Sequence, residues 1–172
     1  AFLLGAVLFL STNRLQAQTF EPVLVTDLNE GSESSDPSSM TVFNDKLYFA
    51  ADDGINRAGL WSYDTTNGSA LVNKGFDWSR AELTVFQDKL YFAADDGING
   101  AELWSYDKTN GAVLIADIRA GSDSSNPNWL LVFKDKLYFG AREEINGIEL
   151  WSYDSTNGAV LAKDITAGSL HA

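Results

Sequence analysis

The 172-residue chain contains no cysteine, one histidine, three prolines and 12 basic residues against 24 acidic ones. Without cysteine it has no disulfide framework, no thiol nucleophile and no thiolate metal site, and its histidine, His171, stands beside the last residue. The formal net charge of −12 opposes binding to nucleic acid phosphates or to anionic lipid surfaces. The absence of cysteine and the single histidine exclude most catalytic and metal sites that use these residues. The excess of acidic residues excludes nucleic acid as a partner.

No apolar run is long enough to cross a membrane as a helix. The longest run, AFLLGAVLFL at 1–10, has about half of the roughly 20 apolar residues that a spanning helix requires. It has the length of a signal-peptide core and is followed by the polar segment STNRLQAQ, in which Ala17 offers a small residue for cleavage. The pattern predicts a signal peptide over 1–17, export of the mature chain, and no membrane insertion after the signal is removed. Because the run begins at Ala1 without a methionine or a basic segment, the alternatives are a truncated signal and a chain that starts inside a buried segment.

Most of the remaining chain consists of three copies of one sequence repeat. Segments 41–68, 84–111 and 131–158 match position by position without a gap, and each is followed by an apolar stretch such as AVLIADI at 112–118. PVLVTDL at 22–28 is the same stretch standing ahead of the first copy. The predicted organisation is a leading strand and loop over 22–40, followed by repeat units over 41–83, 84–130 and 131–172.

Each unit has the local pattern of four short antiparallel strands. In the second copy, LTVF and KLYFAA are joined by the two-residue link QD, and ELWSYD and AVLIADI follow after turn-forming segments. Both faces of KLYFAA are apolar, so the sheet must be covered on both sides, and helix should be nearly absent. Radial stacking of such sheets is a β-propeller, so we predict an all-β, propeller-like fold of three blades plus the leading strand.

The repeated text resembles the ELWxxDGT repeat family, found in exported and surface-attached bacterial proteins. The likeness rests on AELWSYDKTNG, on KLYFAADDGING before it and on VLIADIRAGSDSSNP after it, and it covers about residues 22–168. The DGT element is DTTNG, DKTNG or DSTNG here, and the first copy has GLW where the others have ELW. The resemblance implies a propeller-like fold and a secreted or cell-surface bacterial protein, and it carries over no catalytic residues.

Aromatic residues and one aspartate recur in every copy. Aromatics held at repeat positions fill the same slot between neighbouring sheets, which predicts a structural core. The aspartate closes the Trp-bearing strand before TNG, and a carboxylate there accepts backbone N–H bonds of the turn. The predicted core comprises Trp61, Trp104, Trp151, Tyr48, Tyr91 and Tyr138, and the predicted turn residues are Asp64, Asp107 and Asp154.

The segment ADDGINGAEL is the candidate for a cofactor, which would be calcium. Asp95, Asn99 and Glu102 are oxygen-bearing residues at short spacing, with Asp52 and Asn56 at matching positions of the first copy. Gly97 occupies the middle ligand position, and Arg142 replaces the first aspartate in the third copy. We therefore interpret the segment as a solvated turn and keep calcium as the alternative.

Three function classes remain open. The first is a non-catalytic surface module for adhesion or for binding a glycan or a protein. The second is part of a glycan-active enzyme, which requires a pair of carboxylates that departs from the repeat. Such departures occur at Glu82, Glu143 and Glu144, and nothing in the sequence marks them as a pair. The third is a purely architectural segment of a larger surface protein.

Three blades do not close a propeller, which typically has about 4–8. The sequence therefore predicts an open arc whose partners are further blades of the same protein. Apolar faces would be exposed on its first and last blades, and such surfaces drive association.

Overall fold

The computed structural model describes residues 22–31, 33–56, 58–78, 82–145 and 147–163. These residues form twelve strands in three four-stranded antiparallel sheets, and they contain no helix. The all-β prediction and the count of four strands in each unit are confirmed. The predicted signal peptide over 1–17 lies outside the described residues. Within them, no helix has the length and apolar character needed to cross a membrane.

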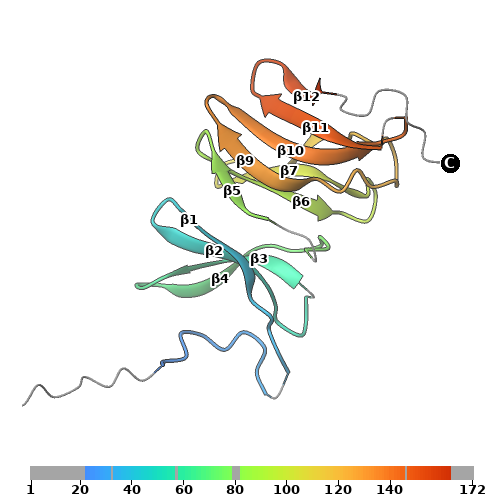
Figure 1. Cartoon of the computed structure of the whole chain (residues 1–172). Coiled ribbons are helices and arrows are strands. Elements are labelled where there is room, and N and C mark those ends of the chain that lie inside the picture. Colours follow the sequence, from blue (N-terminus) through green and yellow to red (C-terminus); the bar gives the residue numbers. More distant parts are fainter. Residues whose placement is uncertain (1–21, 32, 57, 79–81, 146, 164–172) are drawn as a thin grey trace, which may run out of the picture.

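Each sheet is one repeat unit with its strands in chain order (Figure 1). The first strand of unit 1 and the first strand of unit 3 begin slightly before the predicted unit boundaries at 41 and 131. Unit 1 contains β1 (Ser38–Phe43), β2 (Lys46–Asp52), β3 (Ala58–Asp64) and β4 (Gly68–Asn73). Unit 2 contains β5 (Thr84–Phe86), β6 (Lys89–Asp95), β7 (Ala101–Asp107) and β8 (Gly111–Ala116). Unit 3 contains β9 (Asn128–Phe133), β10 (Lys136–Glu143), β11 (Gly147–Asp154) and β12 (Gly158–Lys163).

The first hairpin of each unit is closed by the predicted two-residue turn. In units 1 and 2 both turn residues have positive φ, 48° and 60° at Asn44 and Asp45, and 46° and 58° at Gln87 and Asp88. Two-residue hairpins favour these left-handed values because they match the twist of the paired strands, and Asn and Asp tolerate them. The later TNG turn uses positive φ at its glycine, with φ 71° at Gly111.

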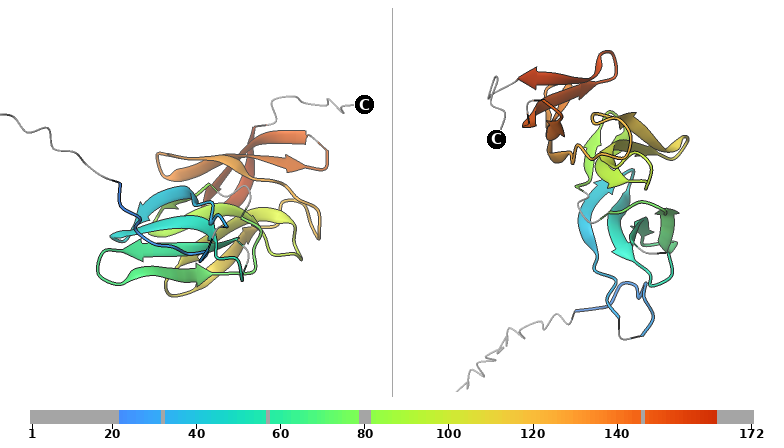
Figure 2. Two further views of the ribbon diagram at one scale, coloured as in Figure 1. Left: turned by 90° about the horizontal axis from the view of Figure 1, so that it is seen from below. Right: turned by 90° about the vertical axis from the view of Figure 1, so that its right-hand side faces the viewer.

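The three sheets stack face to face in chain order, with units 1 and 3 at the two ends (Figures 1 and 2). We call the side of a unit that faces the next unit its forward face, and the opposite side its rear face. The forward face of unit 1 packs on the rear face of unit 2 in one buried cluster, and units 2 and 3 share a second cluster. The first cluster includes Phe43, Tyr48 and Leu60 against Leu90, Phe92 and Trp104. The second includes Phe86, Tyr91 and Leu103 against Leu137, Phe139 and Ala141.

The prediction of a leading strand over 22–28 is wrong. This segment is not in a strand, and Val23, Leu24 and Val25 are 82%, 77% and 63% exposed. A fourth strand pairs with the third strand of its own sheet, and in unit 1 that position is already held by β4. Without a strand to receive its backbone hydrogen bonds, an apolar sequence alone does not make a strand.

The predicted core aromatics differ in burial according to their place in the stack. Trp104, Tyr48 and Tyr91 are 7%, 6% and 2% exposed because a neighbouring unit covers them. Trp61 and Trp151 are partly buried. Tyr138 is also only partly buried, because no sheet among the described residues covers the forward face of unit 3.

Candidate functional site

The repeated aspartate of the WSYD strand stabilises its own hairpin. Asp107 Oδ1 accepts hydrogen bonds from the backbone N–H groups of Thr109 and Asn110 at 2.9 and 2.8 Å, and Lys89 Nζ lies 3.2 Å from its Oδ2. The side chain and backbone of Asn110, together with Lys89, hold the pKa of Asp107 well below its usual range. Asp64 and Asp154 have the same contacts and the same direction of pKa shift. These three carboxylates therefore stabilise the turns of their own hairpins.

The DDGING segment also uses its carboxylates locally. Asp96 Oδ1 accepts the N–H groups of Ile98 and Asn99 at 2.9 and 2.8 Å, and its Oδ2 accepts the Asn99 amide at 2.7 Å. Asp95 Oδ1 accepts the N–H of Gly97 at 2.7 Å. The first copy repeats this pattern, with Asp52 bonded to Gly54 and Asp53 bonded to Asn56.

The structure does not bring all of the candidate calcium ligands together. The β6–β7 register pairs Asp95 with Ala101 and Ala94 with Glu102. Because side chains alternate along a strand, the Asp95 and Glu102 side chains lie on opposite faces of the sheet. In the part of the chain that the structure describes, no group of three or more His, Asp or Glu side chains is placed to hold a metal ion. The structure therefore does not bring the side chains of Glu102 and Asp95 together.

Glu102 instead holds the link between units 2 and 3. Its fully buried carboxylate accepts the backbone N–H groups of Ile118, Arg119 and Ser125 at 3.0, 3.4 and 2.8 Å, and the Ser125 hydroxyl at 2.5 Å. Burial raises the pKa of Glu102, and these hydrogen bonds oppose that rise. The backbone oxygen of Ser125 then accepts the N–H of Arg142 at 2.8 Å, which joins the link to unit 3.

Unit 1 has no glutamate at this position, and the link that follows it is too short to be held in the same way. Gly59 stands at the Glu102 position, and a Cβ there would lie 2.8 Å from Leu71 Cδ1 and 2.9 Å from the Asn73 oxygen. The link after unit 1 is four residues shorter, and Phe76 and Trp78 anchor it on the rear face of unit 2. The unit with glutamate is followed by the long link, and the unit with glycine is followed by the short link. Sequence reasoning missed this correlation, although both differences are visible in the aligned copies.

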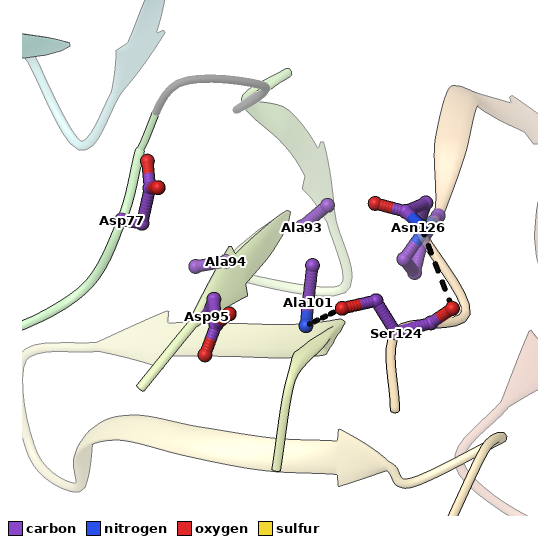
Figure 3. A pocket seen from close by; sticks show the side chains of 8 residues that line it. Asp77, Ala93, Ala94, Asp95, Ala101, Ser124 and Asn126 are labelled. Atoms are coloured by element: carbon purple, nitrogen blue, oxygen red, sulfur yellow. Dashed lines mark hydrogen bonds between the residues drawn. The ribbon is translucent and has the colours of Figure 1, made fainter. Parts of the chain in front are cut away.

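A small pocket lies where the two links meet the edge of unit 2 (Figure 3). Its walls include Asp77, Asp95, Ala101, Ser124 and Asn126. Ala101 is bonded to the second link through both backbone groups, donating to Ser124 Oγ at 2.9 Å and accepting from the Asn126 N–H at 3.0 Å. The Asp77 and Asp95 backbones also bond to each other, with a distance of 2.8 Å from N to O. This network fastens the links to the sheet.

The acidic residues that depart from the repeat lie at two places in the fold. Glu82 Oε2 accepts the backbone N–H of Leu130 at 3.2 Å, which ties the start of unit 2 to unit 3. Glu143 ends β10, and Glu144 is exposed in the turn that follows. Glu82 therefore has a structural contact between units, and Glu143 and Glu144 are neighbours at the end of β10.

The forward face of unit 3 is an exposed apolar surface. Phe133 is 57% exposed, whereas its counterparts Phe43 and Phe86 are 5% exposed. Leu150 is 37% exposed, whereas its counterparts Leu60 and Leu103 are fully buried. A shallow groove crosses this face between Trp129 and Leu131 on β9 and Ile148 and Leu150 on β11, with Tyr138 and Gly140 beneath.

Three residues of the groove depart from the repeat toward larger apolar side chains. Trp129 replaces Ser39 and Glu82, Leu131 replaces Thr41 and Thr84, and Ile148 replaces Ala58 and Ala101. Trp129 is 72% exposed, and its ring lies over Gly140, where an added Cβ would be 3.4 Å from Trp129 Cε3. Sequence reasoning missed these residues because it looked for departures from the repeat only among the acidic residues, and these departures are apolar.

The chain matches no family model, no curated protein and no solved structure.

Proposed function

We propose that the chain is an exported or cell-surface binding module of propeller-like repeat architecture. It is non-catalytic, and it binds a protein ligand on the forward face of unit 3. The observation that carries the proposal is the exposure of Trp129, Leu131, Phe133 and Ile148, at 72%, 65%, 57% and 56%, on one contiguous sheet face. Contiguous exposed apolar patches on soluble proteins mark interaction sites, whereas scattered apolar residues do not.

The chemistry of the groove favours a protein over a glycan. Aliphatic side chains of Leu131, Ile148 and Leu150 surround the aromatic rings, and the groove is lined mainly by apolar atoms. Apolar cores with aromatic anchors are typical of protein interfaces. Sugars present hydroxyl groups, so a site for them needs several polar partners beside the aromatic ring.

The repeated carboxylates support a non-catalytic assignment. Asp107 and Asp96 accept hydrogen bonds from their own turns, and Glu102 accepts four from a link. A glycosidase requires two carboxyl groups that face one substrate across a defined gap. The geometry gives these three residues scaffold roles instead.

The test compares the wild type with the triple variant Trp129→Ser, Leu131→Thr and Ile148→Ala, which gives unit 3 the residues of unit 1. Because unit 1 accommodates these residues at equivalent positions, the variant should keep the melting temperature of the wild type within a few degrees. A phage-displayed peptide library is selected on the wild type, and the same two proteins are probed on a polysaccharide array with measurement of released reducing ends.

We expect selected peptides with aromatic and aliphatic residues that bind the wild type and lose at least about tenfold in affinity for the variant, as removal of an apolar anchor predicts. Release of reducing ends by the wild type would overturn the non-catalytic assignment. Polysaccharide binding that the triple variant retains would place the ligand site elsewhere on the chain.

A further inference from the structure

We propose that the forward face of unit 3 binds the rear face of unit 1 of a second copy of this chain, so that copies associate head to tail. This inference rests on the proposed function, because it assigns a partner to the same face. The two faces lie at opposite ends of the stack (Figure 2). They are the faces that the stacking of units 1 to 3 leaves uncovered.

The rear face of unit 1 is exposed along its β1 side, whereas Phe49 and Ala51 in the middle of the face are buried and residues 27–30 lie beside Trp61. Val42 is 69% exposed, whereas Val85 and Val132 are 39% and 38% exposed. Leu47 is partly exposed, whereas Leu90 and Leu137 are fully buried against the preceding unit. The β1 side of the unit 1 rear face therefore exposes side chains of the kind that the internal contacts bury, and it is the part open to a second copy.

The internal contacts supply the template for docking. Tyr48 of unit 1 packs on Tyr106 of unit 2 with ring centres 6.1 Å apart, and Tyr91 of unit 2 packs on Tyr153 of unit 3 at 5.4 Å. The next pair in the series is Tyr138 with Tyr63 of the second copy. Within the described residues, no tyrosine of a neighbouring unit stacks on the ring of Tyr138 or of Tyr63.

The side chains at the β9 edge of unit 3 are apolar, which suits contact with an apolar side chain of a second copy. Between units 2 and 3 this edge is polar, because Glu82 accepts the N–H of Leu130 at 3.2 Å and Thr84 donates its hydroxyl to the Leu130 oxygen at 3.3 Å. Unit 3 carries Trp129 and Leu131 at the positions of Glu82 and Thr84. The unit 1 counterpart of Leu130 is Met40, which is 59% exposed. An apolar edge of unit 3 thus meets an apolar side chain of the second copy.

Such contacts are heterologous, since two different faces meet. A dimer joined in this way keeps one free forward face on one copy and one free rear face on the other, so the association either closes into a ring or continues into a chain. A dimer formed by two identical faces would instead stop at two copies and would depend on one face alone.

The test uses one variant to block each face. Leu131→Arg places a charge on the forward face of unit 3, and Leu47→Arg places one on the rear face of unit 1. Both leucines are at least partly exposed within one copy, so melting temperatures near the wild-type value verify that both variants fold. Val42→Arg, at a more exposed position of the same rear face, replaces Leu47→Arg if the latter melts early. Ile98→Arg, in an exposed turn of unit 2, which carries neither end face, is the matched control.

Sedimentation velocity from low to high micromolar concentration should show association of the wild type and of Ile98→Arg, and monomers for each blocked variant alone. An equimolar mixture of Leu131→Arg and Leu47→Arg should form a 1:1 dimer and nothing larger, because one intact face of each kind remains. Loss of association in Leu131→Arg but not in either rear-face variant would show an identical-face dimer and overturn the proposal. A wild type that stays monomeric would also overturn it, and the peptide selection would still decide the binding function independently.

Discussion

Replacement of Glu102 by alanine should lower the free energy of unfolding by about 3–5 kcal/mol, because each buried donor left without an acceptor costs about 1–3 kcal/mol. The carboxylate is fully buried and accepts hydrogen bonds from three backbone N–H groups and one hydroxyl. After its removal these donors are enclosed without an acceptor, and the link between units 2 and 3 loses its anchor. Urea unfolding followed by tryptophan fluorescence measures the change.

Glu144→Ala is the control for this substitution. Glu144 is exposed in a turn, so its loss should change the free energy of unfolding by less than about 0.5 kcal/mol. If Glu102→Ala were as stable as Glu144→Ala, the buried carboxylate would not hold the link. The contacts of Glu102 would then have to be reassigned.

The second large effect is expected for Trp104→Ala, with a loss of about 3–5 kcal/mol for an aromatic removed from a core. Trp104 is 7% exposed, and its ring meets Phe76 edge-on with centres 4.7 Å apart. Its indole N–H makes no hydrogen bond within the described part of the chain, so the loss reports packing between units 1 and 2.

Trp129→Ala is the matched tryptophan control, because Trp129 is 72% exposed. Its removal should cost less than about 1 kcal/mol, since little apolar surface leaves a covered environment. Equal losses at Trp104 and Trp129 would contradict the distinction between a covered internal face and an uncovered end face.

The strands and the stacking of the sheets could be predicted from the sequence where a local apolar pattern recurred in all three repeat units. Two apolar faces along KLYFAA required sheets on both sides, and unit 2 shows Phe92 packed toward unit 1 and Tyr91 toward unit 3. The segment at 22–28 shows the limit of this reasoning. It has the same apolar pattern as β8, yet a strand also needs a neighbouring strand, and sequence pattern does not supply one.

The candidate site was less accessible to sequence reasoning. Glu102 was grouped with Asp95 because they are close in the sequence, but the alternation of side chains places them on opposite faces. Trp129, Leu131 and Ile148 were missed for another reason. Departures from the repeat were sought only among the acidic residues, whereas the surface particular to unit 3 consists of apolar positions at which that unit departs.

The central claim is that units stack forward face on rear face and leave the forward face of unit 3 open. Because the chain has no cysteine, Phe43→Cys, Phe86→Cys and Phe133→Cys each introduce a single thiol at the same repeat position. The labelling rate with a thiol reagent is measured at low micromolar concentration in the Leu47→Arg background, which prevents coverage by a second copy. The thiol at 133 should react at the rate of an exposed cysteine, and those at 43 and 86 on the order of 100-fold more slowly, because they require local opening. Equal rates at the three positions would contradict the stacked arrangement.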